Sequence, residues 1–325
     1  MRSLESGTIT LLNRPFQVFG DADDSQFSAF LRVGTWEQIP LHRFSAFLKP
    51  DSICLDLGAN IGMVTLALSL LCPKGHVYAF EASKDTAEAL RQTALANHLK
   101  NVSVGQAILG DEDKEVRFFD IPGVSTSSFA VSKESDKTVH VLTYPYTDKE
   151  SNVTVARTKS VDQIVRELNI PRVDFIKIDV EGSELDVLDG AKETLARFKP
   201  IILMEFNSRC FISARGILPA QALSKILQTF DSVYWFKHEN GTITLLERAE
   251  VEREKFLTAN YDQVADLLCC FDGAELHNFR LLDEIQNLKF ANEQLQLKLK
   301  NKWISVLKRK FKRFLRRFSS PSPQS

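Results

Sequence analysis

The sequence lacks a long hydrophobic run and an apolar N-terminal leader. Its longest apolar stretch, residues 64–72, is interrupted by Thr65 and Ser69. It is far shorter than the roughly 20 residues that cross a bilayer. The opening residues, MRSLESGTIT, contain no apolar core of the kind that secretory signals carry. These absences argue against a membrane-spanning helix, and we expect a cytoplasmic protein.

Cysteine is scarce and unpatterned. The five cysteines are Cys54, Cys72, Cys210, Cys269 and Cys270. They form no C-x-x-C pair and no metal-ligand spacing, and an odd number argues against a disulfide framework. We therefore expect reduced thiols, as in cytosolic proteins.

The charged residues are unevenly distributed. The 325 residues have a net charge of only −1, but nine of the 41 basic residues lie between Lys300 and Arg317, where there is no acid. The remaining 32 basic residues stand against all 42 acidic residues, so the rest of the chain has a net charge of −10. A basic tail on an acidic protein suggests that the tail has a partner of its own.

From Asp51 onward, short β-rich runs alternate with helical segments. Strands are predicted at residues 52–57, 76–81, 173–179 and 199–206, and helices at residues 61–71, 83–99 and 183–198. The last helix begins with Ser183 and Asp186 in the spacing of a capping box. Such alternation is typical of βαβ units in a mainly parallel sheet, and it predicts an α/β domain over residues 51–270. Residues 1–50 are predicted to form a lead-in of two short strands, which meet at a turn, and a helical segment.

The residues after Gly273 differ in character. A heptad pattern is formed by Leu281, Ile285, Leu288, Asn292, Leu295 and Leu299. Over residues 271–301 it predicts either a dimeric coiled coil or a long amphipathic helix folded back onto the domain. Residues 302–325 interleave aromatic residues with cations at helical spacing, which favours an anionic membrane surface. A solvated tail or a protein partner is the alternative, and nucleic acid is disfavoured because no reading element accompanies the patch.

The stretch ICLDLGANIGMVTLAL, residues 53–68, places an acid and two glycines where the first strand of this domain turns into a helix. In a parallel sheet, ligands bind at such turns, and Gly58 and Gly62 let a ligand approach the backbone. The spacing Asp56-x-Gly58-x-x-x-Gly62 differs from the G-x-G-x-x-G dinucleotide fingerprint. Asp56 would repel a pyrophosphate but would suit an ammonium group. S-adenosylmethionine carries an ammonium group and no phosphate, so it fits this loop better than a dinucleotide does.

Further acids follow the other predicted strands. Glu81 ends the second strand, where a carboxylate can accept hydrogen bonds from both hydroxyl groups of a ribose. Asp179 and Glu181 follow the third of these strands, and Glu205 lies at the end of the fourth. They suit an acid–base role or a cation site, although solvated strand ends and helix-dipole charges give a similar pattern. Lys177, inside its strand, needs a partner if it is buried.

Eight segments together resemble the FkbM-type methyltransferases. In order along residues 34–207 they are WEQIP, ICLDLGANIGMVTLAL, VYAFEAS, NVSVGQAILGDED, STSSF, VDQIV, VDFIKIDVEGSELDVLDGAKETL and PIILMEFN. The pair D-x-G-A-N-x-G and K-I-D-x-E-G-x-E carries most of the specificity. The resemblance implies a Rossmann-like class I methyltransferase with a doubly wound, mainly parallel sheet. It also implies methyl transfer from S-adenosylmethionine, commonly to hydroxyl groups of sugars or natural products.

The resemblance implies a set of site residues as well. The cofactor-binding residues would be Asp56, Gly58, Ala59, Asn60, Gly62, Glu81, Gln106, Ser127 and Ser128. Asp179, Glu181 and Glu205 are our catalytic candidates, because a sugar hydroxyl is a poor nucleophile and gains from a base or a metal that lowers its pKa. Mg²⁺ held by Asp179, Glu205 and Asn207 is one such arrangement, and the sequence leaves open whether a metal is used.

These observations predict an S-adenosylmethionine-dependent O-methyltransferase that acts on a saccharide, a glycolipid or a similar natural product. We expect a homodimer, and a lipid-linked glycan would place the acceptor and the basic tail at the same membrane. The main alternative is a non-catalytic adaptor with the methyltransferase fold, which acts through the coiled coil and the tail. A nicotinamide oxidoreductase comes third, because the loop spacing disfavours it.

Overall fold

The computed structural model of the chain describes residues 3–34, 47–121, 128–132, 152–236, 243–246 and 264–271. The chain divides into two units, Met1–Gly273 and Ala274–Ser325. The second unit lies entirely outside the described residues, and so does Ser127. The coiled coil, the basic tail, the homodimer and the membrane contact therefore stay predictions.

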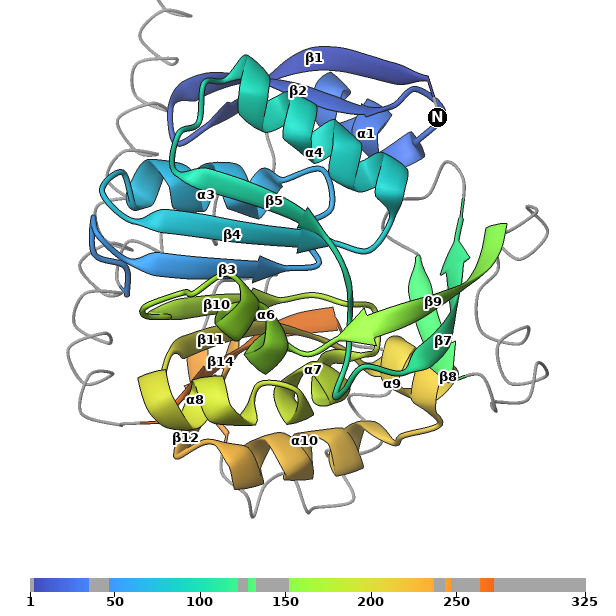
Figure 1. Cartoon of the computed structure of the whole chain (residues 1–325), viewed down its shortest axis with the longest axis vertical. Coiled ribbons are helices and arrows are strands. Elements are labelled where there is room, and N and C mark those ends of the chain that lie inside the picture. Colours follow the sequence, from blue (N-terminus) through green and yellow to red (C-terminus); the bar gives the residue numbers. More distant parts are fainter. Residues whose placement is uncertain are drawn as a thin grey trace, which may run out of the picture. The chain divides into compact units, whose positions relative to one another are not determined.

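Among the described residues, eight strands form the central sheet of the first unit (Figure 1). In spatial order they are β13 (Ile243–Leu245), β12 (Ser232–Phe236), β14 (Val264–Cys270), β11 (Ile201–Asn207), β10 (Phe175–Ile178), β3 (Ile53–Leu57), β4 (His76–Glu81) and β5 (Val102–Gln106). The five strands from β11 to β5 are parallel, whereas β14 runs antiparallel between β11 and β12. The prediction of a mainly parallel sheet is confirmed.

The strand order reverses its direction beside β3. From β3 the chain moves outward to β4 and β5, and it then returns to place β10 and β11 on the other side of β3. Loops that leave β3 and β10 therefore turn in opposite directions and open a crevice at the carboxyl ends of these strands. This switch point is where open α/β sheets bind their ligands.

Helices connect the strands and cover the sheet. Those described are α1 (Ser25–Val33), α3 (Met63–Leu71), α4 (Lys84–Ala96), α6 (Val161–Glu167), α7 (Glu184–Asp189), α8 (Lys192–Phe198), α9 (Ser208–Arg215) and α10 (Pro219–Thr229). As predicted, Ser83 is the N-cap of α4, where its hydroxyl accepts a hydrogen bond from the Thr86 amide, and the helix buries Ala87 and Leu90. None of the helices within these described ranges is both long enough and apolar enough to cross a bilayer.

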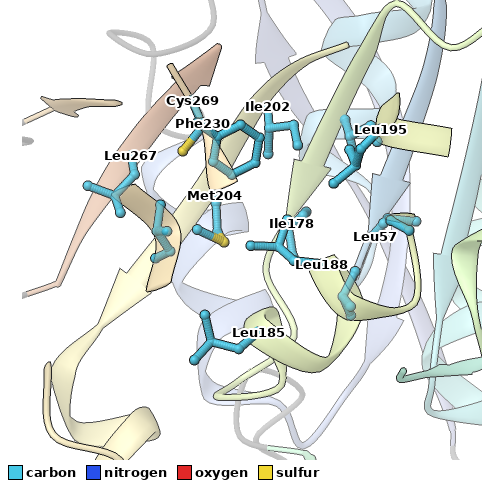
Figure 2. Close-up of a cluster of buried hydrophobic side chains, with 14 of the residues drawn as sticks. Leu57, Ile178, Leu185, Leu188, Leu195, Ile202, Met204, Phe230, Leu267 and Cys269 are labelled. Carbon is cyan, nitrogen blue, oxygen red and sulfur yellow. The ribbon is translucent and has the colours of Figure 1, made fainter. Parts of the chain in front are cut away.

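The side chains of the parallel strands alternate between two faces. On one face, apolar residues pack against α6, α7, α8 and α10 and form the main core. Figure 2 shows this cluster with Leu57, Ile178, Leu185, Leu188, Leu195, Ile202, Met204, Phe230, Leu267 and Cys269. The opposite face carries charges near the carboxyl ends of the strands, because Asp56 on β3 lies beside Lys177 on β10.

Two smaller β-structures complete the described part of this unit. β1 (Leu4–Leu11) and β2 (Arg14–Asp21) form the predicted hairpin, whose turn residues Leu12 and Asn13 have positive φ. A second sheet has the order β6 (Ile108–Leu109), β9 (Asn152–Lys159), β7 (Glu115–Asp120) and β8 (Phe129–Ser132). Figure 1 shows this sheet near the carboxyl ends of β4 and β5.

The helix predicted over residues 183–198 is wrong in two respects. It is broken into α7 and α8 at Gly190, because the Thr194 amide, which would donate to the Gly190 carbonyl oxygen in a continuous helix, donates to Asp162, and the Asp162 amide donates to that carbonyl oxygen. The capping box at Ser183 does not form, since its side chain makes no cap hydrogen bond and instead accepts one from Arg215. At the start of α8, the amides of Glu193 and Thr194 donate to the carboxylate of Asp162.

Candidate active site

The glycine loop follows β3 and is held tightly against its neighbours. Gly58 and Gly62 have φ values of 80° and 97°, which favour glycine. A Cβ atom at Gly58 would lie 1.7 Å from the carbonyl oxygen of Asp179, and one at Gly62 would lie 2.2 Å from a methyl group of Leu90. These glycines are therefore required for packing within the chain, in addition to the approach of a ligand that we predicted.

Glu81 fastens this loop to the end of β4. Its Oε2 atom accepts a hydrogen bond of 2.8 Å from the Asn60 amide, and its Oε1 atom accepts one of 2.9 Å from the Ser83 amide. Each carboxylate oxygen can accept two hydrogen bonds, so one position on each oxygen is left for a ribose hydroxyl. Burial raises the pKa of Glu81 to about 7, although the backbone amides of Ser83, Asn60 and Ala82 oppose this shift.

A pocket opens beside Glu81 at the switch point of the sheet. Its polar side comes from the glycine loop and the end of β4, namely Gly58, Asn60, Glu81 and Ala82. Its apolar wall comes from the segment after β5 and from the small sheet, namely Ala107, Ile108, Leu109, Phe118, Phe129 and Ala130. Asp179, Val180, Glu181, Ser183 and Ser128 complete the lining. A ligand with a polar ribose and a flat apolar base fits these first two surfaces.

The predicted cofactor residues are not all in the lining. Asp56 is buried beneath the loop, where it accepts a hydrogen bond of 2.5 Å from the Thr65 hydroxyl, and burial raises its pKa to about 6. Ala59 and Gly62 belong to the loop, but they do not line the pocket. Gln106 is exposed and donates to the carbonyl oxygen of Ala82, and the next residue, Ala107, is the one that lines the apolar wall.

Three carboxylates converge at the end of the pocket that Asp179 and Glu181 line. Asp179, Glu181 and Glu205 each offer an oxygen atom, and these atoms lie within 4.8 Å of one another. The pKa values of Glu181 and Glu205 are raised well above the ordinary range. Burial is the larger cause, and the negative charge of the neighbouring Asp179 is the second. Asn207, which we expected beside them, instead caps α9, because its side-chain oxygen accepts a hydrogen bond from the Cys210 amide.

Lys177 is the buried cation beside this cluster. Its Nζ atom lies 3.6 Å from a carboxylate oxygen of Asp179 and 3.5 Å from one of Asp266. Burial alone would lower the pKa of Lys177, but the surrounding carboxylates outweigh it and raise the pKa. The lysine therefore stays charged and offsets part of the negative charge. The partner that the sequence required comes partly from β14, which is distant in the chain.

The turn after β10 aims Glu181 at the pocket. Glu181 has a φ of 52°, and Gly182 follows with 95°. A residue other than glycine rarely adopts a positive φ, and such strain persists only where the surroundings enforce it. The amides of Val180 and Gly182 both donate to Glu184, and the thiol of Cys210 donates to Glu181 across 3.3 Å.

Several residues of the site escaped sequence reasoning. Phe118, Phe129 and Ala130 form the apolar wall, but in the sequence they look like ordinary residues of small strands. Cys210 had no signal of its own. These residues reach the site because the small sheet and α9 pack beside it, and such packing leaves no periodic pattern in the sequence.

The sheet order, the glycine loop after β3 and the acid at the end of β4 define a Rossmann-like class I methyltransferase. Residues 56–231 match the family model of the Methyltransferase FkbM domain. The chain therefore belongs to the FkbM family of S-adenosylmethionine-dependent methyltransferases.

Curated relatives place this domain in different contexts. The chain is 30% identical over 204 residues to the AMB antimetabolite synthetase AmbE of Pseudomonas aeruginosa. This match covers 56% of the present chain but only 9% of AmbE. It is 26% identical over 216 residues to the 2-O-methyltransferase NoeI of Sinorhizobium fredii, with 65% of this chain and 86% of NoeI covered. It is 29% identical over 160 residues to the hexuronic acid methyltransferase AglP of Haloferax volcanii, and the match covers 48% of this chain and 56% of AglP.

Proposed function

We propose that this protein transfers a methyl group from S-adenosylmethionine to a hydroxyl group of a saccharide. The observation that carries the proposal is the carboxylate cluster at one end of a pocket whose other sides suit an adenosine. The names of NoeI, a 2-O-methyltransferase, and AglP, a hexuronic acid methyltransferase, support a sugar hydroxyl as the acceptor. A glycolipid is the variant of this acceptor that the basic tail would favour.

The reaction is an in-line displacement. The acceptor oxygen forms a bond to the methyl carbon while the carbon–sulfur bond breaks, and the electron pair of that bond neutralises the sulfonium. The hydroxyl proton passes to a base, and Glu181 is our candidate because this residue lines the pocket. Positioning the two reactants supplies most of the acceleration in such a transfer, and the base makes the hydroxyl a better nucleophile.

A magnesium ion is a further candidate for the carboxylate cluster. Its preferred ligands are carboxylate oxygens and water, and Asp179, Glu181 and Glu205 provide three carboxylates close together. Bound there, Mg²⁺ would lower the pKa of an acceptor hydroxyl. Titration of the full chain with Mg²⁺ tests this part, and binding that Glu205→Gln abolishes would support it. An absence of Mg²⁺ binding would leave Lys177 as the cation of the cluster.

The experiment that tests the proposed function has two stages. Isothermal titration with S-adenosylhomocysteine measures cofactor binding, and we expect micromolar affinity. Transfer of an isotope-labelled methyl group is then measured over a panel of neutral saccharides, uronic acids and amino sugars. Turnover that falls at least tenfold in Glu181→Gln, with cofactor affinity retained, supports the proposal. Binding without turnover on any member of the panel would favour the adaptor, and no binding by the folded chain would refute both cofactor use and transfer.

A further inference from the structure

Helix α9 contacts the turn after β10 at both of its own ends. The helix follows β11 without an intervening loop, because Asn207 ends the strand and also caps the helix. In the first turn of α9, Cys210 is almost fully buried, and its thiol donates to Glu181 Oε2 across 3.3 Å. The start of the helix is thus hydrogen-bonded to Glu181, one of the residues that line the pocket.

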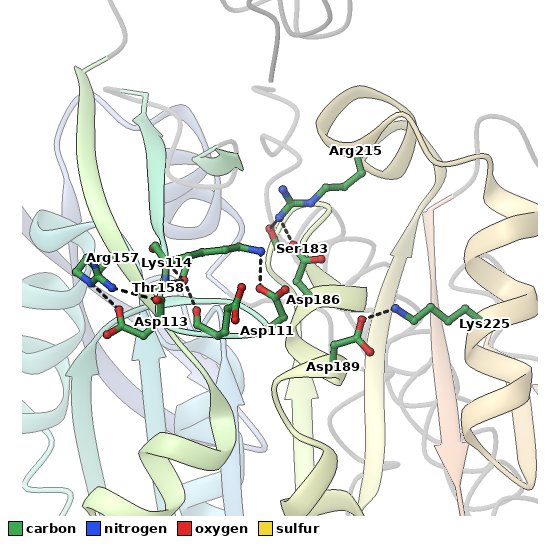
Figure 3. Close-up of polar contacts among 11 residues, drawn as sticks. Asp111, Asp113, Lys114, Arg157, Thr158, Ser183, Asp186, Asp189, Arg215 and Lys225 are labelled. Carbon is green, nitrogen blue, oxygen red and sulfur yellow. Dashed lines mark hydrogen bonds and ion pairs between the residues drawn. The ribbon is translucent and has the colours of Figure 1, made fainter. Parts of the chain in front are cut away.

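The other end of α9 reaches the same turn through Arg215. Its guanidinium group donates to the Ser183 hydroxyl across 2.6 Å and pairs with a carboxylate oxygen of Asp186 at 2.6 Å. Figure 3 shows Arg215 extending from its helix toward both partners. Ser183 also lines the pocket. Glu181 and Ser183, which both line the pocket, are therefore hydrogen-bonded to opposite ends of α9.

The turn itself needs such support. Glu184 holds it from within, because its Oε1 atom accepts hydrogen bonds from the amides of Val180 and Gly182. These two hydrogen bonds fix the backbone on either side of Glu181. The strained φ of 52° at Glu181 means that the conformation depends on its surroundings. The Cys210 thiol donates a hydrogen bond to the Glu181 carboxylate itself.

We infer that Cys210 and Arg215 are positioning residues, which clamp the turn of residues 179–183 and hold Glu181 and Ser183 toward the pocket. The catalytic meaning of this clamp rests on the proposed function, because there Glu181 acts on the acceptor. The mechanical part does not depend on that function. Cys210→Ala removes the donor to the carboxylate, whereas Cys210→Ser keeps a donor at the same place.

Hydrogen exchange measured by mass spectrometry on the full chain tests the clamp without an acceptor. In Cys210→Ala and in Arg215→Gln, we expect peptides that cover residues 179–184 to exchange at least tenfold faster, with β3 and β4 unchanged. Cys210→Ser should restore near-native exchange. The control is Cys269→Ala, which alters another buried thiol on the main-core face of the same sheet and should leave this turn unchanged.

Either of two exchange results would overturn the inference. One is unchanged exchange of the turn in Cys210→Ala and Arg215→Gln. The other is an equal increase over the whole sheet, which would show general destabilisation instead of a local clamp. Affinity for S-adenosylhomocysteine should change less than threefold in both variants, because the glycine loop and Glu81 are untouched, and a loss above tenfold would also contradict the assignment. Failure of every saccharide to accept a methyl group would refute the proposed function and leave the exchange result standing.

Discussion

Replacing Glu81 by glutamine should weaken cofactor binding. In the native chain both carboxylate oxygens accept backbone hydrogen bonds, from Asn60 at 2.8 Å and from Ser83 at 2.9 Å. Glutamine has nearly the same shape but keeps only one of these acceptors, since its amide nitrogen can only donate. One backbone amide of the loop or of the α4 start then loses its partner, and one ribose hydroxyl loses its acceptor.

The size of the effect follows from the hydrogen bonds that are lost. A hydrogen bond to a charged group contributes about 1.5–3 kcal/mol, and 1.4 kcal/mol corresponds to a tenfold change in affinity. If the loss falls mainly on the bound state, the dissociation constant for S-adenosylhomocysteine should rise by about tenfold to a hundredfold in Glu81→Gln. The assay is isothermal titration at pH 8, where the native carboxylate is mostly ionised.

The pH dependence of the same titration provides a second readout. Burial raises the pKa of Glu81 to about 7, and only the ionised carboxylate accepts from both ribose hydroxyl groups. The ionised fraction falls about tenfold between pH 8 and pH 6 for such a pKa, so affinity should weaken by about that factor as the pH is lowered. Glu81→Gln should flatten this profile.

Glu88→Gln is the matched control, because Glu88 lies on α4 and pairs with the nearby Arg91 at the surface. It should bind S-adenosylhomocysteine with native affinity and with the native pH profile. A dissociation constant for Glu81→Gln within threefold of the native value would refute the role of Glu81. A pH profile that persists in Glu81→Gln would assign the titration to another group.

Three further predictions concern stability. Gly58→Ala should lower the free energy of unfolding in urea by more than about 2 kcal/mol, because the new methyl group meets the Asp179 carbonyl. Gly34→Ala, with a similar φ but open space, should cost only about 1 kcal/mol; equal costs would refute the packing argument. Lys177→Met should lower the free energy of unfolding by about 3–5 kcal/mol at pH 8, since it removes the buried cation that pairs with Asp179 and Asp266, and a neutral effect would contradict that account. Burial raises the pKa of Glu184 to about 7, so its favourable contribution is complete below about pH 4.5 and is lost as the pH rises through 7. Between pH 4.5 and 8, the free energy of unfolding of the native chain should therefore fall by up to about 3 kcal/mol more than that of Glu184→Gln. Parallel curves of this free energy against pH would rule this out.

The sheet and the polar side of the pocket could be predicted because they follow local rules. Strand and helix periods identify the parallel strands, and parallel strands bring their carboxyl ends to one edge of a sheet. Glu81, Asp179 and Glu205 each end or follow such a strand, so their approach in space required no knowledge of the packing. The glycine loop could also be predicted, because the turn after β3 requires glycine at positions 58 and 62, where φ is positive.

The remaining features depend on contacts between distant segments. Lys177 is partnered by Asp266 only because β14 inserts antiparallel beside β11, and the spacing of residues does not reveal such an insertion. The break of the helix at Gly190 follows from the hydrogen bonds that Asp162, on α6, makes with the Thr194 amide and the Gly190 carbonyl oxygen. Cys210 reaches Glu181 through the position of α9. Each of these features is a property of the packed chain, which the local pattern does not contain.

Methyl transfer itself tests the central claim most directly. The full chain is incubated with S-adenosylmethionine carrying a ¹³C-labelled methyl group and with the saccharide panel, and the products are examined by NMR. The account predicts a labelled methoxy group on a sugar carbon, formed by the native chain and at least tenfold more slowly by Glu181→Gln. Binding of S-adenosylhomocysteine with no labelled product on any saccharide would contradict it.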